Sequence, residues 1–378
     1  MTFSTELLKW YEHNRRILPW REDPSPYHVW LSEIMLQQTR VEAVRDYYLR
    51  FIEKLPDIRS LAEAPEDTYL KLWEGLGYYS RVRNLHRAAS VIIEEYNGEM
   101  PGTSAELMRL PGIGPYTAAA IASIAFGEAV PAVDGNLLRV FARLSGYEGN
   151  IRTPAAQKAA AEFYKEHMPD VSSAERKTGK GDPDSTGRQS SPLRQGNPYG
   201  NFNQALMDLG ATVCLPNSAP ECGRCPLAEA CRIHKERPGE ESSLPVMPDR
   251  KEKKTEYLTV FLIRSGGRTA VRKRPPRGLL AGLYEFPNTA GTLDTDEALK
   301  WLREHAVEPL RIRRIEDAGH IFTHRIWKMR GYEVDADPFT EEQTPFIMAS
   351  GEEILDKYSI PSAFGAYLDR IKGEKVRF

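Results

Sequence analysis

Two acidic residues occupy positions in which a carboxyl group can take part in catalysis. Glu33 lies in the apolar run of residues 29–36, either on the solvated edge of a helix or partly desolvated with a raised pKa. Asp134 precedes another apolar helix, where the commonest role of an aspartate is to cap the helix. Two carboxyl groups in unlike environments can supply one proton and one negative charge to the same reaction.

All four cysteines of the chain fall in one short segment with the spacing C-x7-C-x2-C-x5-C. They are Cys214, Cys222, Cys225 and Cys231. Four thiolates this close suit either a zinc site or a 4Fe-4S cluster, and their clustering indicates a reducing compartment. Spacing alone does not separate these two possibilities, and the nearby His234 also allows a mixed zinc site.

A helix-hairpin-helix is predicted over residues 105–126, with its turn at Leu110-Pro111-Gly112-Ile113-Gly114. Gly112 and Gly114 permit the tight backbone turn, and the second helix begins at Pro115. Backbone N–H groups at such a helix start suit a phosphate oxygen. The hairpin is therefore predicted to bind a nucleic-acid backbone, with Thr117 beside the two glycines.

The segment that follows the hairpin gives the first resemblance to a known family. A Pro-rich turn leads to Val133-Asp134-Gly135-Asn136, and this joint pattern resembles the helix-hairpin-helix, Gly/Pro, Asp superfamily of DNA glycosylases. In that superfamily the matching aspartate faces the sugar of an extruded nucleotide. Relatives that also cleave the DNA backbone carry a lysine at the position of Tyr116. A phenol cannot form an imine with the sugar, so the resemblance implies a monofunctional glycosylase.

The motif LSEIMLQQT, residues 31–39, resembles the MutY family of adenine DNA glycosylases. The resemblance implies that Glu33 is the general acid and that Gln38 enters the base stack. Gln37 is expected one helical turn from Glu33, where it can orient the carboxyl group or touch the base. With Trp20 and Arg21, Gln37 is expected to form the adenine pocket.

Two further segments resemble the same family. Leu76 and Tyr78 match residues that fill the space opened in the duplex by base extrusion. Phe322, Thr323 and His324 match a Phe-Ser-His turn that recognises 8-oxoguanine in the opposite strand. Threonine keeps the hydroxyl of the family's serine. The alternative for this turn is a strand end with Phe322 in the core and His324 in solvent.

The expected mechanism uses both acids. Protonation at N7 by Glu33 makes adenine a neutral leaving group, while an ionised Asp134 stabilises the oxocarbenium-like sugar. Tyr116 is expected to hydrogen-bond Asp134 or to stabilise the cation. Asn136 is expected to orient either Asp134 or the attacking water.

The chain has 378 residues, 41% of them hydrophobic, which is enough for two domains. The expected fold is a mainly α-helical helix-hairpin-helix glycosylase domain with an iron-sulfur loop, plus a C-terminal α/β Nudix-like domain without a catalytic acidic box. The expected boundaries are residues 1–235 for the catalytic domain, 236–256 for a linker and 257–378 for the 8-oxoguanine recognition domain. Within the first domain, residues 214–231 are expected to form the iron-sulfur loop, and residues 171–200 are expected to form a mobile surface insert that departs from the family.

The resemblance favours a 4Fe-4S cluster at the four cysteines, although the family has six residues in the first gap and this chain has seven. The expected partner is double-stranded DNA containing adenine opposite 8-oxoguanine or guanine. The formal net charge is −2, so a DNA-binding face must be local. No apolar run of membrane-spanning length or signal peptide is evident, so we expect a cytoplasmic, nucleoid-associated monomer without membrane contact.

Three alternatives stay open. A glycosylase that also cleaves the backbone is disfavoured by Tyr116. A monofunctional thymine or uracil mismatch glycosylase fits if the C-terminal domain does not recognise 8-oxoguanine. A non-catalytic iron-sulfur DNA-binding protein is disfavoured because both Glu33 and Asp134 are present.

Overall fold

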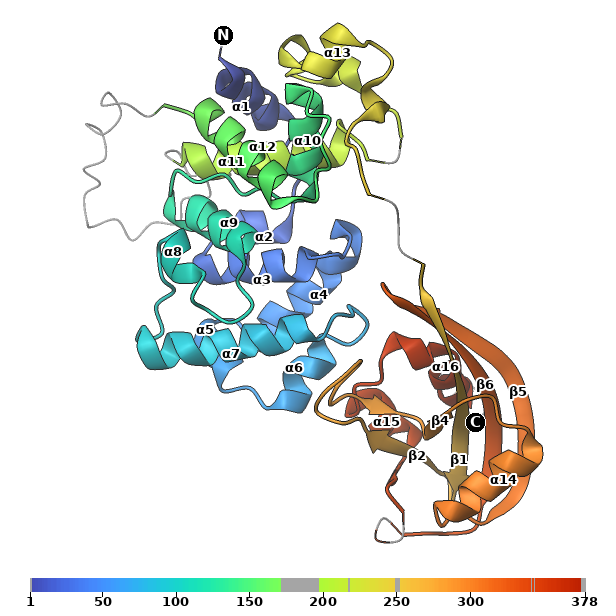
Figure 1. Cartoon of the computed structure of the whole chain (residues 1–378). Helices are drawn as coiled ribbons and strands as arrows, with labels where there is room; N and C mark the ends of the chain where they lie inside the picture. Colours follow the sequence, from blue (N-terminus) through green and yellow to red (C-terminus); the bar gives the residue numbers. More distant parts are fainter. Residues whose placement is uncertain are drawn as a thin grey trace. The chain divides into compact units, whose positions relative to one another are not determined.

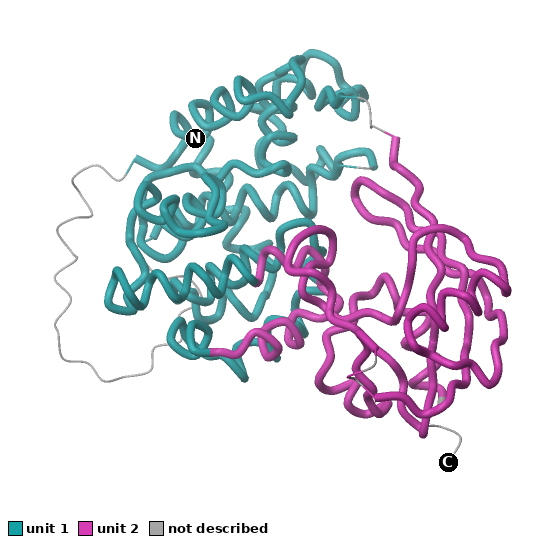
Figure 2. The backbone as a smooth tube through the Cα atoms, turned by 60° about the horizontal axis from the view of Figure 1, so that its bottom comes forward, with its two compact units in different colours: residues 1–63, 83–249 teal, residues 64–82, 250–378 magenta. Residues whose placement is uncertain are grey.

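The computed structural model describes residues 2–170, 197–216, 218–248, 252–340, 342 and 344–374. The chain divides into two compact units, which Figure 2 colours separately. The first unit contains residues 1–63 and 83–249, and the second contains residues 64–82 and 250–378. No helix in the described ranges has the length and apolarity that crossing a membrane requires.

The first unit is helical, with helices as labelled in Figure 1. Its helices are α1 (Phe3–Asn14), α2 (Pro19–Glu22), α3 (Pro26–Leu36), α4 (Val41–Lys54), α5 (Ile58–Ala62), most of α7 (Ser80–Glu95), α8 (Ser104–Leu107), α9 (Pro115–Phe126), α10 (Gly135–Ser145), α11 (Pro154–His167), α12 (Pro198–Thr212) and α13 (Arg232–Glu236). Short 3-10 turns, η1 (Cys222–Arg224), η2 (Ala228–Ala230) and η3 (Glu241–Ser243), lie in its last part.

Helix α9 is the central helix of this unit. Its residues Thr117 to Ala125 are all buried, which fits its alanine-rich, nearly uncharged sequence. It packs against α3 on one side and α12 on another. Because alanine side chains are small, these neighbours approach α9 closely and hold the hairpin turn in a fixed place.

The predicted helix-hairpin-helix is present as α8, a turn and α9. Gly112 has a φ of +76°, in the left-handed region that favours glycine. A Cβ atom at Gly112 would lie 2.5 Å from the Cβ of Asn84, so the turn needs glycine for space as well. Gly114, the N-cap of α9, has φ −90° and nothing within 4 Å of a Cβ placed there.

The helix expected to continue through Gln37 is shorter than predicted. Helix α3 ends at Leu36, Gln37 is its C-cap, and Gln38 has a φ of +60°. The chain resumes as α4 at Val41. Gln37 itself keeps a helical φ of −57°, and both Glu33 and Gln37 line the cavity described below, so the left-handed backbone at Gln38 redirects the chain only after Gln37.

The second unit is a mixed sheet with helices on both faces. Its strands are β1 (Lys254–Ser265), β2 (Arg268–Lys273), β3 (Tyr284–Glu285), β4 (Asn288–Ala290), β5 (Pro309–Ile321), β6 (Arg325–Ala336) and β7 (Ile347–Ala349). The strand order is β3-β2-β1-β6-β5, with β4 on β1 and β7 on β2; β1 and β6 run parallel, and β5 and β6 are antiparallel. Its helices are α6 (Glu66–Leu72), α14 (Thr295–Glu304), α15 (Gly351–Asp356) and α16 (Gly365–Glu374), with the turn η4 (Ser362–Phe364).

Two apolar clusters fill the two faces of this sheet. One cluster joins the sheet to α15 and α16 through residues such as Ile354 and Tyr367, and the other joins it to α14 through Ala298 and Leu302. Strand β1 alternates its central side chains between the clusters, with Val260 in the first and Phe261 in the second. This is the predicted α/β domain, in which β1 and β2 pair as an antiparallel hairpin.

The boundaries differ from the expected ones. Leu244, inside the expected linker of residues 236–256, is buried in the core of the helical unit, and the backbone N–H of Ile151 donates to the Val246 carbonyl at 3.3 Å. Residues 64–82 group with the sheet, where Lys71 Nζ donates to the Tyr358 carbonyl at 3.2 Å. Residues 171–196 of the expected insert lie outside the described residues, and Asn197 caps α12.

Candidate active site

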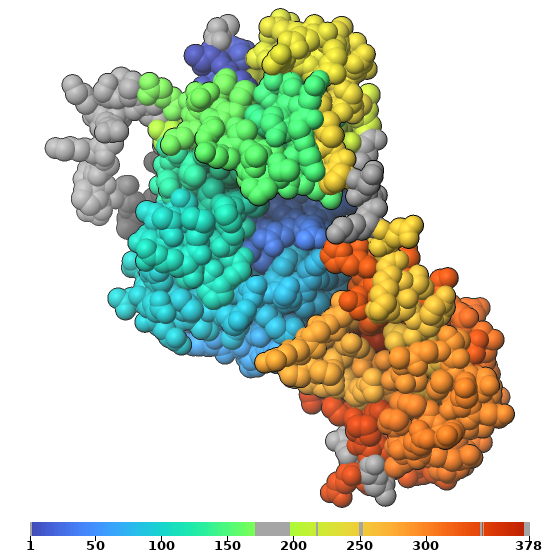
Figure 3. Space-filling view, viewed as in Figure 1, coloured from blue at the N-terminus to red at the C-terminus, as the bar shows by residue number. Residues whose placement is uncertain are grey.

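A cavity of about 810 Å³ opens in the helical unit and is lined by all four predicted catalytic residues. We call it the central cavity. In the space-filling view this unit is hollowed between the blue N-terminal helices and the green helices that follow the hairpin (Figure 3). The predicted residues that line it are Trp20, Arg21, Glu33, Gln37, Gln38, Gly112, Gly114, Tyr116, Thr117, Asp134 and Asn136.

Glu33 faces the central cavity from α3, a helix begun by the Ser25 cap and Pro26. Its side chain is nearly enclosed, with 6% of its surface exposed. Burial raises the pKa of Glu33 from 4.5 to about 7; the negative charge of Asp134 acts in the same direction, while the Tyr116 hydrogen bond and Arg21 oppose it. The carboxyl group is therefore substantially protonated at neutral pH, as a general acid must be.

The hydroxyl of Tyr116 hydrogen-bonds Glu33 in place of the expected Asp134, while the other expected role, stabilisation of the sugar cation, stays a prediction. The hydroxyl donates to Glu33 Oε2 at 2.6 Å. The contact forms because Tyr116 is the second residue of α9, which packs directly against α3. Desolvation raises the pKa of the Tyr116 phenol well above 10, so the phenol remains protonated and acts as a donor.

Asp134 combines both roles considered for it, because it caps α10 and lines the cavity. Its Oδ1 accepts from the Leu137 N–H at 2.8 Å, and its Oδ2 accepts from Asn136 Nδ2 at 3.1 Å. Burial raises the pKa of Asp134 above 3.8, although the hydrogen bonds from Leu137 and Asn136 lower it. In the DNA-free protein, burial therefore disfavours the ionised form of Asp134. A positive charge nearby would favour that form.

Asn136 also connects Asp134 to the cysteine loop through a residue that the sequence analysis missed. Arg139 Nη2 donates to Asn136 Oδ1 at 3.0 Å, and Arg139 Nε donates to the Cys214 carbonyl at 3.0 Å. Arg139 is 6% exposed. The sequence did contain a signal for this contact. Arg139 lies three residues after Asn136 in an otherwise apolar stretch of helix, where a charged side chain needs polar partners.

A second missed residue is Asp208 on α12, whose side chain is fully buried. It accepts from Arg16 Nε at 2.6 Å and from Arg21 Nη1 at 2.7 Å. Burial alone would raise the pKa of Asp208, but the hydrogen bond and charge of Arg21 lower it below 3.8, with Arg16 adding to the effect. Asp208 thus holds the guanidinium of Arg21 at the cavity wall, close enough to affect Glu33.

The mouth of the cavity carries Gln37, Gln38 and the hairpin glycines. Gln37 Nε2 donates to Thr117 Oγ1 at 3.2 Å. Thr117 is 2% exposed in the DNA-free protein, and its expected DNA contact stays a prediction. Thr117 lies in the first turn of α9, where it holds the amide of Gln37, and the hairpin glycines Gly112 and Gly114 are exposed.

The remaining predicted DNA contacts belong to the second unit. Leu76 is 7% exposed, whereas Tyr78 is 44% exposed and has a φ of +49°. The Tyr78 hydroxyl hydrogen-bonds Thr323 Oγ1. This contact brings the predicted wedge residue and the predicted 8-oxoguanine contact together at one place.

Phe322, Thr323 and His324 form the turn between β5 and β6. The Phe322 ring is partly buried, with its centroid 4.8 Å from Trp327 and 4.6 Å from His320. Thr323 and His324 are exposed. Phe322 therefore anchors the turn on the domain core, and the other two residues present their side chains outward.

The four cysteines surround a small apolar cavity beside α10. Arg143 Nη1 donates to Cys214 Sγ at 3.2 Å. In the described part of the chain, no three of the four thiols come within 4.8 Å of one another. A single tetrahedral zinc needs sulfur atoms about 3.8 Å apart, given zinc–sulfur bonds of about 2.3 Å. The thiols are therefore spaced more widely than a single tetrahedral zinc ion requires.

Two arginine side chains of the cysteine loop region are paired with glutamate side chains. Arg224 forms an ion pair with Glu221, and Arg232 forms one with Glu236 at 2.8 Å. In the protein alone, burial raises the pKa of Cys225 to about 12. A thiolate at Cys225 therefore needs the positive charge of a bound metal.

Comparison with known proteins agrees with this architecture. Residues 31–166 match the model of the HhH-GPD superfamily base excision DNA repair protein, and residues 259–370 match the NUDIX domain. A thermostable thymine-DNA glycosylase of known structure is 27% identical and has a TM-score of 0.50, covering 62% of this chain and 95% of its own. The fold and cavity thus define a helix-hairpin-helix base-excision DNA repair protein with a Nudix-like domain, which confirms the predicted fold class.

Full-length relatives make the assignment narrower. The adenine DNA glycosylase of Rattus norvegicus is 34% identical over 85% of this chain and 68% of its own length. That of Buchnera aphidicola subsp. Baizongia pistaciae is 33% identical over 86% of this chain and 83% of its own. The chain belongs to the adenine DNA glycosylase family.

Proposed function

We propose that the protein hydrolyses the N-glycosidic bond of adenine in duplex DNA where adenine lies opposite 8-oxoguanine or guanine. The observation that carries this proposal is Glu33, a carboxyl group with a pKa of about 7 that shares one cavity with Asp134. One group can donate a proton at neutral pH and the other can provide a negative charge. This division of labour is what removal of a purine requires.

The reaction begins with adenine turned out of the helix into the central cavity. Glu33 transfers its proton to adenine N7, so that the base departs as a neutral molecule when the C1′–N9 bond breaks. The Tyr116 hydrogen bond at 2.6 Å orients the carboxyl group and stabilises the carboxylate left behind. The base keeps the electron pair of the broken bond.

Loss of the base leaves positive charge on the sugar, and Asp134 faces that charge. The N–H of Leu137 and the amide of Asn136 fix the orientation of its carboxylate. Water then adds its oxygen to C1′ and gives a proton to the ionised Glu33, which restores the acid. The product is an abasic site with both strands intact, since Tyr116 cannot form the imine that strand cleavage needs.

The hairpin and the wedge residues act on the rest of the duplex. Exposed backbone N–H groups at Gly112 and Gly114 bind a phosphate near the extruded nucleotide. Gln38 enters the base stack, and the exposed Tyr78 occupies space opened by extrusion, which offsets part of the unstacking energy of a few kcal/mol. Leu76 is buried in the DNA-free protein.

The second unit makes removal of an undamaged base safe. The exposed Thr323 and His324 recognise 8-oxoguanine in the opposite strand, and the Phe322 ring fixes the turn that carries them. The Tyr78 hydroxyl, bonded to Thr323, lies at the same position. Excision is thereby tied to the lesion across from adenine, and the protein acts as a monomer.

Cys214, Cys222, Cys225 and Cys231 would hold a 4Fe-4S cluster, which would supply structural rigidity to the loop but no redox step. The wide thiol spacing supports a cluster over a single ion. The contact of Arg139 with the Cys214 carbonyl and with Asn136 ties this loop to the catalytic aspartate. The loop thereby acts as a support for the active site.

The proposal is tested by base excision under single-turnover conditions, on duplexes with adenine opposite 8-oxoguanine, guanine or cytosine. We expect the 8-oxoguanine duplex to react fastest, and Glu33→Gln and Asp134→Asn to lose at least about a thousandfold in rate, since each removes an interaction of the transition state. Full activity in either variant would overturn the assignment.

Duplexes with thymine or uracil opposite guanine test the alternative substrate class. Faster excision from these duplexes than from adenine duplexes would show that the substrate is a mismatched pyrimidine and not adenine. Borohydride trapping of a covalent DNA adduct would contradict the monofunctional mechanism. We expect neither result.

A further inference from the structure

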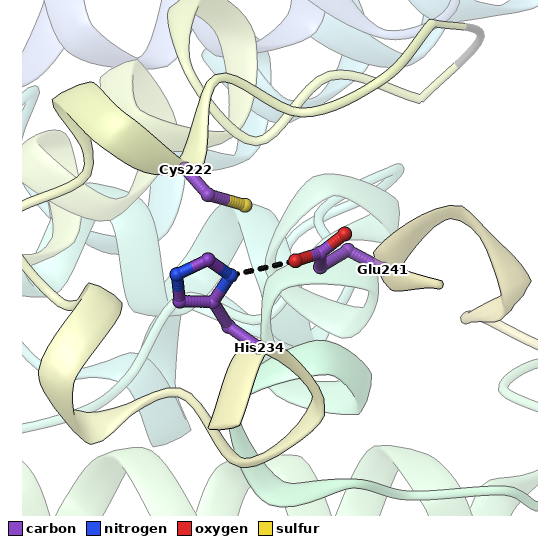
Figure 4. Close-up of side chains that lie close together, drawn as sticks. All are labelled: Cys222, His234 and Glu241. Carbon is purple, nitrogen blue, oxygen red and sulfur yellow. Dashed lines mark hydrogen bonds and ion pairs between the residues drawn. The ribbon is translucent and has the colours of Figure 1, made fainter. Parts of the chain in front are cut away.

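A second group of metal-binding side chains lies at the edge of the cysteine loop. His234 on α13 and Glu241 in η3 face Cys222 of η1 (Figure 4). One ligand atom of each of the three residues lies within 4.8 Å of those of the other two. Nothing in the reaction described above uses His234 or Glu241.

Glu241 and His234 form a close pair within this group. His234 Nδ1 lies 2.6 Å from Glu241 Oε1. Glu241 is 8% exposed, and His234 keeps about a third of its side-chain surface in solvent. A nearly buried carboxylate beside an imidazole and a thiol is a set of one oxygen, one nitrogen and one sulfur ligand. Zinc and similar divalent cations accept all three ligand types.

The spacing separates this group from the cysteines as a whole. The set of Cys222, His234 and Glu241 is compact enough for one ion after small side-chain movements. The four thiols are not, because no three of them in the described ranges lie within the same limit. A single ion and a multinuclear cluster would therefore use two different groups of ligand residues, and Cys222 belongs to both groups.

We propose that Cys222, His234 and Glu241 form a mononuclear site for a divalent cation of the zinc class. Because a thiolate at Cys222 is needed by both sets, this site and the cluster exclude one another. The exclusion rests on the proposed 4Fe-4S cluster, whereas the mononuclear site does not depend on the glycosylase reaction. The loop can thus take either a cluster or a single ion.

The test is a titration of the full chain with Co²⁺, which replaces zinc and reports its ligands by absorption. Protein freed of its cluster should bind one equivalent, with a thiolate-to-cobalt charge-transfer band whose intensity corresponds to one thiolate. Protein that keeps its cluster should take up no stoichiometric Co²⁺. Zn²⁺ should displace the bound Co²⁺ and abolish the visible bands.

Two variants identify the ligands. His234→Ala and Glu241→Gln should each weaken Co²⁺ binding at least tenfold, while His13→Ala, on the exposed surface of α1, should leave the affinity unchanged. Circular dichroism shows whether each variant is folded. If His234→Ala is unfolded, Glu241→Gln carries the test. Affinity that does not respond to either variant, or a charge-transfer intensity of four thiolates, would overturn the proposal. Binding of Co²⁺ beside an intact cluster would overturn the exclusion. Failure of adenine excision would leave this site unaffected.

Discussion

The hydrogen bond between Tyr116 and Glu33 sets the acidity of the proposed catalytic acid. Burial raises the pKa of Glu33 to about 7, and the phenol opposes that rise because it donates to the ionised carboxylate. Without the phenol, the protonated form would persist to higher pH. From the sequence, Tyr116 is notable because a phenol cannot form an imine. In the structure it has a second role, since its hydrogen bond lowers the pKa of Glu33.

Replacement of Tyr116 by phenylalanine tests this role through pH. In the wild type, kcat/KM for adenine excision should fall as pH rises through about 7, since the reactive form of Glu33 is protonated. In Tyr116→Phe the alkaline midpoint should move to higher pH, by roughly one unit for a lost charge-assisted hydrogen bond. A midpoint that stays in place or moves to lower pH would contradict the proposed role. Phenylalanine in place of Tyr96, a half-buried residue that follows α7 and does not line the central cavity, is the control.

At the scale of elements, the two ends of the hairpin turn serve different purposes. Gly112 is required by the fold, because its φ is +76° and a Cβ there would press on Asn84. Gly114 has an ordinary backbone conformation and open space around it, so the fold does not require glycine there. A requirement for glycine at Gly114 would come from the ligand, since a methyl group there meets an approaching phosphate.

Alanine substitutions separate these two requirements. Gly114→Ala should leave the melting temperature unchanged and weaken binding of a duplex with an abasic-site analogue several-fold, at fixed salt. Gly112→Ala should lower the unfolding free energy by at least about 1 kcal/mol, because a non-glycine residue must adopt the left-handed conformation. Differential scanning fluorimetry and fluorescence anisotropy measure both effects. Unchanged DNA affinity in Gly114→Ala would argue against the phosphate contact.

The sequence predicted the elements better than it predicted the partners of single residues. Hydrophobic periodicity and turn glycines located the hairpin, and the position of Asp134 before an apolar helix predicted its cap. The break after Leu36 was missed, because the left-handed backbone at Gln38 depends on the packing of α3 and α4 and has no glycine to mark it. The interaction of Asp208 with Arg16 and Arg21 joins residues about 190 positions apart, which no local pattern reveals.

On the scale of the whole molecule, the chain pairs a catalytic unit with a unit that carries the proposed lesion contact. Residues 64–82 lie within the second unit although the sequence runs through them between α5 and α7. Ile360 N–H donates to Glu74 Oε1 at 2.8 Å, and Tyr78 bonds Thr323. Tyr78 and the turn of residues 322–324 thus belong to the same compact unit, although they are about 245 positions apart in the sequence.

Removal of the Thr323 hydroxyl tests the proposed recognition of the opposite base. Thr323→Val keeps the shape of the side chain, so the fold should be intact, but it removes the donor and acceptor. The ratio of single-turnover rates for adenine opposite 8-oxoguanine and opposite guanine should fall about tenfold, the equivalent of one hydrogen bond. Thr323→Ser should keep the ratio. An unchanged ratio in Thr323→Val would remove Thr323 from lesion recognition.

The central claim is that Glu33 protonates adenine at N7 before the base leaves. The most direct measurement compares excision of adenine and of 7-deazaadenine, which lacks that nitrogen, from otherwise identical duplexes opposite 8-oxoguanine. We predict that both duplexes bind within a few-fold of each other and that 7-deazaadenine is not released. Release of 7-deazaadenine at a rate near that of adenine would contradict the account.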